Sequence, residues 1–222
     1  MKHFARHRAI AVAVLVIAVL TYLFAWSPIF QVRAIEISGL PQGITTAAIT
    51  SASEITVGEK LARLEPRAIS NRLKKLTWIA SSDIGRNWLN GKVTIAITSR
   101  KPVGIYQGRA LDASGHIFDF PGKIPSSLPQ VSAKSAAIGL TAIDLFAALP
   151  SDIRESLIAM SATSDRSINT RVTVANRAIS IQWGGVSQLS LKVKVYRALL
   201  ALPENAKVTS IDLSAPHAPI VK

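Results

Sequence analysis

The side chains suited to acid–base or metal chemistry are few in this chain and widely spaced. Its histidines are His3, His7, His116 and His217. Asp112, His116 and Asp119 lie close enough in sequence to contact one metal ion. Their spacing fits no established metal-binding pattern, and Asp112 precedes Ser114-Gly115, where an aspartate commonly stabilises a turn. The sequence therefore predicts a turn here and no metal site.

Nucleophile motifs and nucleotide-binding loops are also missing from the sequence. The chain has no cysteine, which excludes thiol nucleophiles, cysteine metal ligands and disulfide bonds. No serine lies in a Gly-x-Ser-x-Gly or Ser-x-x-Lys arrangement. The pair Gly184-Gly185 is too sparse for a phosphate-binding loop and is typical of the end of a strand. We expect no enzyme activity, no catalytic residue and no bound cofactor.

Three tryptophans, Trp78, Trp88 and Trp183, offer a different chemistry, the stacking of sugar rings. No pair of catalytic acids stands beside them in the sequence. Tryptophans at such positions more often pack in a core or at its edge. A cell-wall enzyme or carbohydrate-binding protein is therefore kept as an alternative, which a convergent pair of acids or a nucleophile in a cleft would favour.

The N-terminal residues predict how the chain is placed relative to a membrane. Residues 9–26 are apolar and uncharged, and as a helix they span about 27 Å, close to the ~30 Å hydrocarbon core of a bilayer. Lys2, Arg6 and Arg8 precede this run, so positive charge lies on its N-terminal side only. This asymmetry predicts a cytoplasmic tail at residues 1–8, a membrane anchor, and export of everything beyond it, a single-pass type II topology.

Two other interpretations of residues 9–26 fit the sequence less well. A cleaved secretory signal has a shorter apolar region of about 7–15 residues and small side chains at its cleavage site, whereas this run ends in the bulky segment from Tyr22 to Trp26. A helix buried in a soluble domain would need a polar face, which this run lacks. We therefore expect an uncleaved signal-anchor.

The strongly basic composition bears on the partners. The formal net charge is +13, which favours anionic counterparts. An exported domain does not meet nucleic acid. The anionic partners that it can meet are lipid head groups, acidic cell-wall polymers or an acidic protein. The competing interpretation is that scattered lysines and arginines only keep the domain soluble.

Residues 30–103 alternate between strand and helix patterns. The sequence predicts a strand at 30–38, a short helix at about 45–53, a second helix from Pro66 to about 76, and strands at 79–86 and 92–98. The second helix places Ile69 and Leu73 at helical spacing. In the last strand Val93, Ile95 and Ile97 alternate with polar or small residues. The predicted order is β-α-α-β-β.

This order directly after an anchor resembles a POTRA domain, and its details resemble the FtsQ/DivIB family of bacterial division proteins. The matching segments are Phe30-x-Val32-x-x-Ile35-x-Ile37-x-Gly39, Gly58-x-x-Leu61, Leu76-x-Trp78-Ile79 and Arg100-Lys101-Pro102-Val103. The family usually carries an acidic residue where this chain has Arg100-Lys101, which is a departure from the pattern.

A second α+β domain with a largely antiparallel sheet is predicted at residues 104–214. Its expected elements are a hairpin around Ser114-Gly115, a helix at 140–149, a short helix opened by a capping box at Asp152 and Glu155, and a hairpin with strands at 172–174 and 179–183.

An amphipathic helix at 189–202 and a strand at 208–213 complete this predicted domain. The helix pattern places Leu191, Leu199 and Leu202 on an apolar face and Lys192 outside it. The block from Gly184 to Pro216 resembles the C-terminal signature of the same family.

The strand at 208–213 is the expected partner-binding surface. It is the last predicted strand, so one edge is expected to have no partner within the chain and to accept a strand from another protein. On the residues alone, an ordinary edge blunted by Lys207 and Asp212 is the simpler reading. The resemblance instead implies that FtsB- and FtsL-type coiled-coil partners are held here. The predicted binding residues are Lys207, Val208, Thr209, Ser210, Ile211, Asp212 and Leu213.

The sequence thus predicts an α+β protein with a single transmembrane helix. Its expected parts are a tail at 1–8, an anchor at 9–26, a POTRA-like domain at 30–103, a second domain at 104–214 and a tail at 215–222. The resemblance implies a non-enzymatic scaffold of the divisome at the septum. The alternatives are a signal-anchored cell-wall enzyme or carbohydrate-binding protein, and a POTRA-bearing envelope assembly factor.

Overall fold

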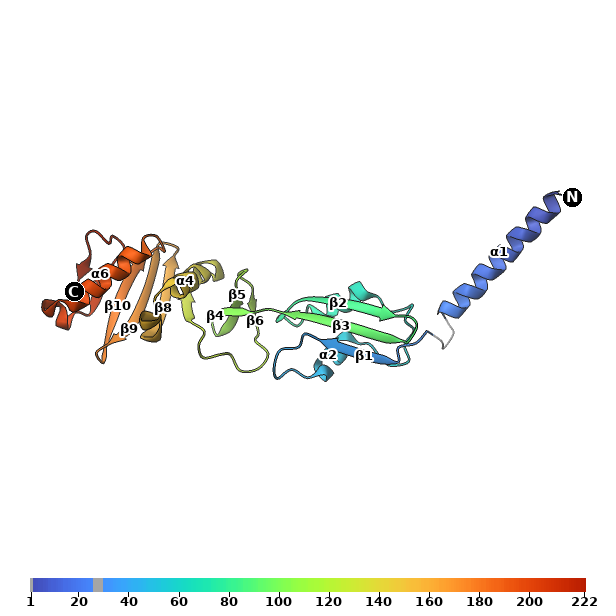
Figure 1. Ribbon diagram of the computed structural model, residues 1–222, viewed down its shortest axis with the longest axis horizontal. Helices are drawn as coiled ribbons and strands as arrows, with labels where there is room; N and C mark the ends of the chain where they lie inside the picture. Colours follow the sequence, from blue (N-terminus) through green and yellow to red (C-terminus); the bar gives the residue numbers. More distant parts are fainter. Residues whose placement is uncertain (1, 26–29) are drawn as a thin grey trace. The chain divides into compact units, whose positions relative to one another are not determined.

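The computed structural model describes residues 2–25 and 30–222, and the chain divides after Arg100 into two compact units (Figure 1). The predicted domain boundary between 103 and 104 falls inside a strand, β4 (Pro102–Tyr106), that belongs to the sheet of the second unit. The second unit therefore begins at Lys101, before the predicted start at residue 104.

The N-terminal element is the helix α1 (Lys2–Ala25). The side chains of residues 10–22 are exposed. Within the described residues, no helix combines the length and apolar character needed to cross a membrane. The predicted anchor at 9–26 includes Trp26, and the predicted tail at 1–8 includes Met1, both of which lie outside the described residues. The anchor stays a prediction.

The first unit has the predicted β-α-α-β-β order. Its elements are β1 (Ala34–Ser38), α2 (Thr46–Ser53), α3 (Pro66–Leu73), β2 (Ile79–Asn87) and β3 (Lys92–Ser99). The sheet order is β1-β3-β2, with β1 parallel to β3 and β2 antiparallel to it. The first strand begins later than predicted, because the segment before it bonds to the loop at 58–61: Leu61 N–H donates to the Phe30 carbonyl at 3.0 Å.

Hydrophobic spacing explains these elements. Pro66 occupies the first turn of α3, where its missing N–H costs no helical bond. Ile69 and Leu73 follow and are fully buried, as the spacing predicts. In β3 the alternate residues Val93 and Ile95 are also fully buried, because successive side chains of a strand face opposite sides of the sheet.

The second unit is built on one mixed sheet. Its strands are β4, β5 (Arg109–Asp112), β6 (Ile117–Phe118), β7 (Gln130–Ala133), β8 (Leu157–Ser164), β9 (Ser167–Val174), β10 (Arg177–Gly184), β11 (Ser210–Asp212) and β12 (Ile220–Val221). Their order is β12-β11-β10-β9-β8-β7-β4-β5-β6. The pairs β4–β7, β7–β8 and β10–β11 are parallel and the others antiparallel, which confirms a largely antiparallel sheet.

The helices of this unit are α4 (Ala136–Ala148), α5 (Ser151–Glu155), α6 (Leu189–Ala201) and the 3-10 helix η1 (Pro203–Lys207). The Ser135 hydroxyl caps α4 by accepting from Ile138 N–H at 3.3 Å, so this helix begins earlier than predicted. The predicted capping box of α5 is wrong: its N-cap residue is Pro150, which has no side chain that could accept a bond. The helix α4 packs on β4, β7 and β8.

Three strands, β7, β8 and β12, were not predicted. In β8 only Met160 and Ala162 are buried, and the intervening side chains are small or polar. Alanine and serine leave a weak alternation of hydrophobicity, so the pattern lacks the usual strand signal. The strand β9 likewise begins at Ser167, before the predicted segment 172–174.

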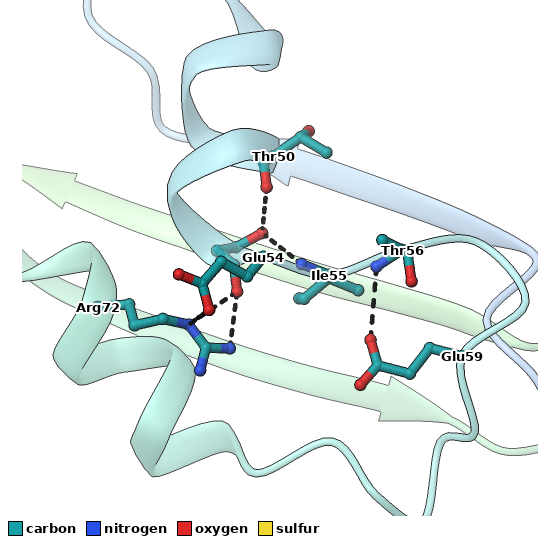
Figure 2. Close-up of polar contacts among 7 residues, drawn as sticks. Thr50, Glu54, Ile55, Thr56, Glu59 and Arg72 are labelled. Atoms are coloured by element: carbon teal, nitrogen blue, oxygen red, sulfur yellow. Dashed lines mark hydrogen bonds and ion pairs between the residues drawn. The ribbon is translucent and has the colours of Figure 1, made fainter.

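An arginine ties the two helices of the first unit together (Figure 2). The Arg72 guanidinium, on α3, donates from Nε and Nη2 to the Ser53 carbonyl at 3.0 and 2.7 Å, and lies 3.4 Å from the Glu54 carboxylate. Ser53 is the last residue of α2 and is fully buried. Since a helix leaves its last carbonyls without an intrahelical partner, Arg72 caps the C-terminal end of α2.

Replacing Arg72 with alanine should therefore destabilise the first unit. Losing charge-assisted bonds to a buried carbonyl costs about 1.5–3 kcal/mol in the free energy of unfolding. The control is Arg67→Ala, an exposed position on the same helix, which should change stability by less than about 0.5 kcal/mol. Urea unfolding of both variants measures the difference, and equal midpoints would contradict the cap.

Candidate partner-binding edge

The predicted partner-binding residues divide into two groups in the structure. Val208, Ile211 and Leu213 are 7%, 1% and 0% exposed and belong to the core of the second unit, so their side chains cannot meet a partner. Outward-facing or partly exposed positions are Lys207, Thr209, Ser210 and Asp212. Only Ser210–Asp212 form the strand β11, because Lys207 ends the preceding helix η1.

The expected open edge of this strand is covered, so that prediction is wrong. The strand β12 pairs antiparallel with β11: Ser210 N–H donates to the Lys222 carbonyl at 3.0 Å, and Lys222 N–H returns a bond to the Ser210 carbonyl at 3.0 Å. Thr209 N–H also donates to the Lys222 carbonyl, at 2.7 Å. The sequence prediction missed β12 because two residues after Pro219 give no periodic pattern.

The strand β12 is therefore the outer strand at this end of the described sheet. Ser210 and Lys222 exchange both of their backbone bonds, so by strand alternation the N–H and C=O of Val221 turn away from β11. Ile220 and Val221 are 56% and 37% exposed. One backbone donor–acceptor pair thus lies at the edge beside two apolar side chains.

A shallow hollow lies on the sheet face next to this edge. Its volume is about 190 Å³, and its lining includes Gln182, Asp212, Ile220 and Lys222. The Asp212 carboxylate accepts from Ser214 N–H at 2.8 Å and so holds the turn that leaves β11. The hollow is thus lined by residues of β10, β11 and β12.

The inner side of β11 rests on β10. Leu213 N–H donates to the Gln182 carbonyl at 2.8 Å, and Ser180 N–H donates to the Thr209 carbonyl at 3.0 Å. The position of the whole edge therefore depends on where β10 ends.

A buried lysine fixes that end. Lys192, on α6, is 1% exposed, and its Nζ donates to the Trp183 carbonyl at 2.7 Å and to the Gly185 carbonyl at 2.8 Å. The prediction that Lys192 lies outside the buried face is wrong, and Leu202, predicted to be buried, is 41% exposed. The helix instead buries Lys192, Val193 and Tyr196, a face rotated toward the end of β10.

The environment around α6 shifts the pKa values of Lys192 and Tyr196 in opposite directions. Burial lowers the pKa of the Lys192 amine from its usual 10.5. Burial, followed by the nearby Asp152 carboxylate, raises the pKa of the Tyr196 phenol above its usual 10.0. The Tyr196 ring lies 6.0 Å from that of Trp183, whose indole N–H donates to the Thr170 hydroxyl at 2.8 Å.

The residues considered for metal chemistry serve local structure instead. The Asp112 carboxylate accepts from the backbone N–H groups of Ser114 and His116 at 2.9 and 3.0 Å, which confirms the predicted turn. The Asp119 carboxylate is paired with the Arg109 guanidinium at 2.7 and 3.1 Å. The two carboxylates thus have separate structural partners.

The tryptophans do not offer the stacking platform that a sugar site requires. Trp183 is fully buried and Trp78 is 7% exposed. Trp88 is half-buried and packs edge-on against Phe30 at 6.1 Å between ring centroids. The carbohydrate-binding alternative therefore loses the residues on which it rested.

The chain consists of a small β-α-α-β-β unit followed by a mixed-sheet unit whose last strands lie at one edge of the sheet. Residues 30–100 match the family described as the POTRA domain of FtsQ type, and residues 99–214 match the C-terminal domain of cell division protein FtsQ/DivIB. The chain belongs to the FtsQ/DivIB family of cell division proteins.

Curated relatives support the same assignment. The chain is 27% identical over 224 residues to the cell division protein FtsQ of Mycolicibacterium smegmatis, an alignment that covers 96% of this chain and 63% of the relative. It is 30% identical over 120 residues to FtsQ of Streptomyces coelicolor, covering 52% of this chain and 45% of that protein. For FtsQ of Salinibacter ruber the identity is 28%, over 46% of this chain and 42% of the relative. The chain thus spans less than two thirds of the length of each.

Substituting Lys192 should show how much the end of β10 depends on its amine. In Lys192→Met the Trp183 and Gly185 carbonyls lose their donor, so we expect the free energy of unfolding to fall by about 1–3 kcal/mol at neutral pH. Lys194→Met, an exposed position on α6, is the control and should change stability little.

The pH dependence of the free energy of unfolding distinguishes the effect of the charge on Lys192 from the effect of its packing. Because the folded amine has the lower pKa, the folded state binds fewer protons, and stability rises with pH between the folded pKa and 10.5. Lys192→Met lacks this rise, while the opposite contribution of Tyr196 is common to both proteins. The stability gap should therefore widen as the pH approaches 10.5 in urea titrations. A gap independent of pH would contradict a buried, titrating amine.

Proposed function

We propose that this protein is a non-enzymatic, single-pass membrane scaffold of the divisome, held at the division septum with both folded units outside the cytoplasm. Its membership of the FtsQ/DivIB family supports a role in cell division. The observation that carries the scaffold role is the C-terminal sheet edge, where the outward backbone of Val221 lies beside exposed apolar side chains. Such an edge is suited to strand addition by another protein.

The proposed anchor is the apolar run at 9–26. Its support is the absence of charge along the run, the basic residues Lys2, Arg6 and Arg8 before it, and the exposed apolar side chains of α1. Ile10, Leu15 and Ile17 are 60%, 64% and 63% exposed. An apolar helix with such exposure gains free energy when it moves from water into hydrocarbon.

The proposed partner-binding surface comprises residues 207–213 together with β12. We infer that a strand of an FtsB- or FtsL-type partner pairs with the outer side of β12, through the backbone of Val221. Lys207 and Lys222 border this edge and favour acidic side chains on the incoming segment. The buried residues of the predicted set support the surface from below, while Thr209, Ser210 and Asp212 hold its backbone and turn.

The topology is tested with a reporter that is active only outside the cytoplasm, fused after Lys222. We expect reporter activity and recovery of the protein in the membrane fraction, because positive charge precedes the apolar run. Exchanging Lys2, Arg6 and Arg8 for glutamate should reduce the exported fraction. Mature protein that begins near residue 27 and is released from the membrane would overturn the anchor.

The partner-binding edge is tested with Val221→Pro. Proline removes the outward N–H of β12 and leaves the bonds of Ser210 and Lys222 intact, so folding should be preserved. The loss of one pairing bond, about 1 kcal/mol, should weaken partner binding about fivefold, and steric exclusion adds to this. Co-purification of FtsB- and FtsL-type proteins from detergent extracts, quantified by mass spectrometry, provides the measurement.

Charge reversal gives a second variant at the same edge. Lys207→Glu should weaken binding of an acidic partner, with a loss that shrinks at high salt. Arg177→Glu, at the exposed start of β10, is the matched control. If the Val221→Pro and Lys207→Glu proteins fold and capture partners like the parent, the proposed surface is wrong.

A further inference from the structure

Two apolar side chains of the first unit are unusually exposed. Leu89 is 95% and Val57 is 69% exposed, the highest values among the large apolar side chains of residues 10–22 and 30–222. Both lie in tight turns, Leu89 between β2 and β3, and Val57 just before Gly58. Single exposed apolar residues are normal on a protein surface, whereas apolar side chains gathered at one end of a unit mark an interaction surface.

These two turns flank the same short segment, the one by which the chain enters the unit. Gly58 N–H donates to the Val32 carbonyl at 2.8 Å on one side of the segment. On the other side, Arg33 N–H donates to the Gly91 carbonyl at 2.7 Å. Figure 1 shows the β2–β3 turn at the end of the sheet where β1 begins. Leu89 and Val57 therefore project from the end of the unit nearest Phe30.

The turn that carries Leu89 is rigid, so its exposure is built into the fold. The Asn87 side chain accepts from Leu89 N–H at 3.0 Å, and the Asn90 side chain accepts from Lys92 N–H at 3.0 Å. The neighbouring Trp88 ring packs against Phe30 and lies 5.4 Å from the Arg86 guanidinium.

Arg86 is itself fixed, because its Nη1 donates to the Leu61 and Leu64 carbonyls at 3.2 and 2.8 Å. This arginine joins the Trp88 turn to the loop that follows Gly58. The two turns are thus held together as one surface.

The segments that border these two turns carry basic side chains. Arg33 and Arg63 are exposed and Lys60 is half-buried, whereas the acid within the two flanking segments, 31–33 and 56–64, is Glu59. An apolar tip with an interfacial tryptophan and a basic border is the composition of a surface that meets anionic lipid head groups.

We propose that Val57, Trp88 and Leu89, bordered by Arg33, Lys60 and Arg63, form a membrane-contact tip that rests on the anionic surface of the bilayer. The inference rests on the proposed anchor, because three residues lie between Trp26 and Phe30 in the sequence, and the four residue steps span at most about 14 Å of extended chain. The tip inserts its two apolar side chains among the head groups, and the basic residues bind lipid phosphate. It thereby fixes the orientation of the first unit on the membrane.

The absence of cysteine makes the tip accessible to single-site labelling of the full chain. Leu89→Cys and Val57→Cys carry an environment-sensitive dye, and the protein is reconstituted into phosphatidylglycerol-containing vesicles that hold a lipid-bound quencher. The control in the same unit is Gln42→Cys, an exposed residue beyond the opposite end of β1. We expect a blue shift and severalfold stronger quenching at 57 and 89 than at 42.

Charge is tested in the same assay. In vesicles of phosphatidylcholine alone, at high salt, or in Arg33→Glu, the quenching at 89 should fall toward the value at 42. Arg177→Glu, an exposed arginine of the second unit, is the matched control and should leave the quenching unchanged.

The outcomes separate the tip from the anchor. Protein that fails to float with the vesicles overturns the anchor, and the tip with it. Protein that floats while the dye at 89 stays as exposed as the dye at 42 overturns the tip alone. Protection at 89 that appears only after adding a cell extract also overturns it, because the surface then binds a protein and not lipid.

Discussion

The two backbone bonds from the buried Lys192 amine fix the end of β10, and the C-terminal edge of the sheet depends on them. Trp183 and Gly185 accept these bonds, next to the Gln182 carbonyl that receives Leu213 N–H. The strand β11 is built on β10, and β12 on β11. Lys192, a helix residue, thus helps to position β12, which lies two strands from β10 in the sheet. Each strand is held mainly by its neighbour.

Basic side chains that donate to backbone carbonyls recur through both units. Arg72 caps α2 through Ser53, and Arg86 joins two loops through Leu61 and Leu64. The composition explains this pattern, since 26 lysines and arginines face 13 acids. Carbonyls at helix ends and strand ends lack regular partners, so an excess of basic side chains can satisfy them. The positive charges that remain exposed are available to anionic partners.

Hydrophobic periodicity predicted the first unit well but failed at the edge of the second. Val93 and Ile95 alternate as a half-buried strand must, and Pro66 marks the start of α3. No such signal accompanies Lys192, because a lysine is buried only where tertiary structure places carbonyls around it. The strand β12 was not predicted either, since it pairs with β11 through backbone bonds, such as those between Ser210 and Lys222, that any sequence can make. The sequence prediction placed the proposed surface at residues 207–213 and missed the strand β12 that pairs with them.

An exposed strand edge carries a risk of unwanted pairing, and the short length of β12 limits that risk. A long exposed strand would pair with any extended chain, including another copy of itself. Here Pro219, which cannot donate a backbone bond, immediately precedes β12, and the ladder between β11 and β12 spans only Ser210 to Asp212. An incoming strand can gain little from the backbone alone. In the proposed function the affinity therefore comes from side-chain contacts with Lys207, Lys222 and Ile220, and we infer that partners with matching acidic and apolar groups are favoured.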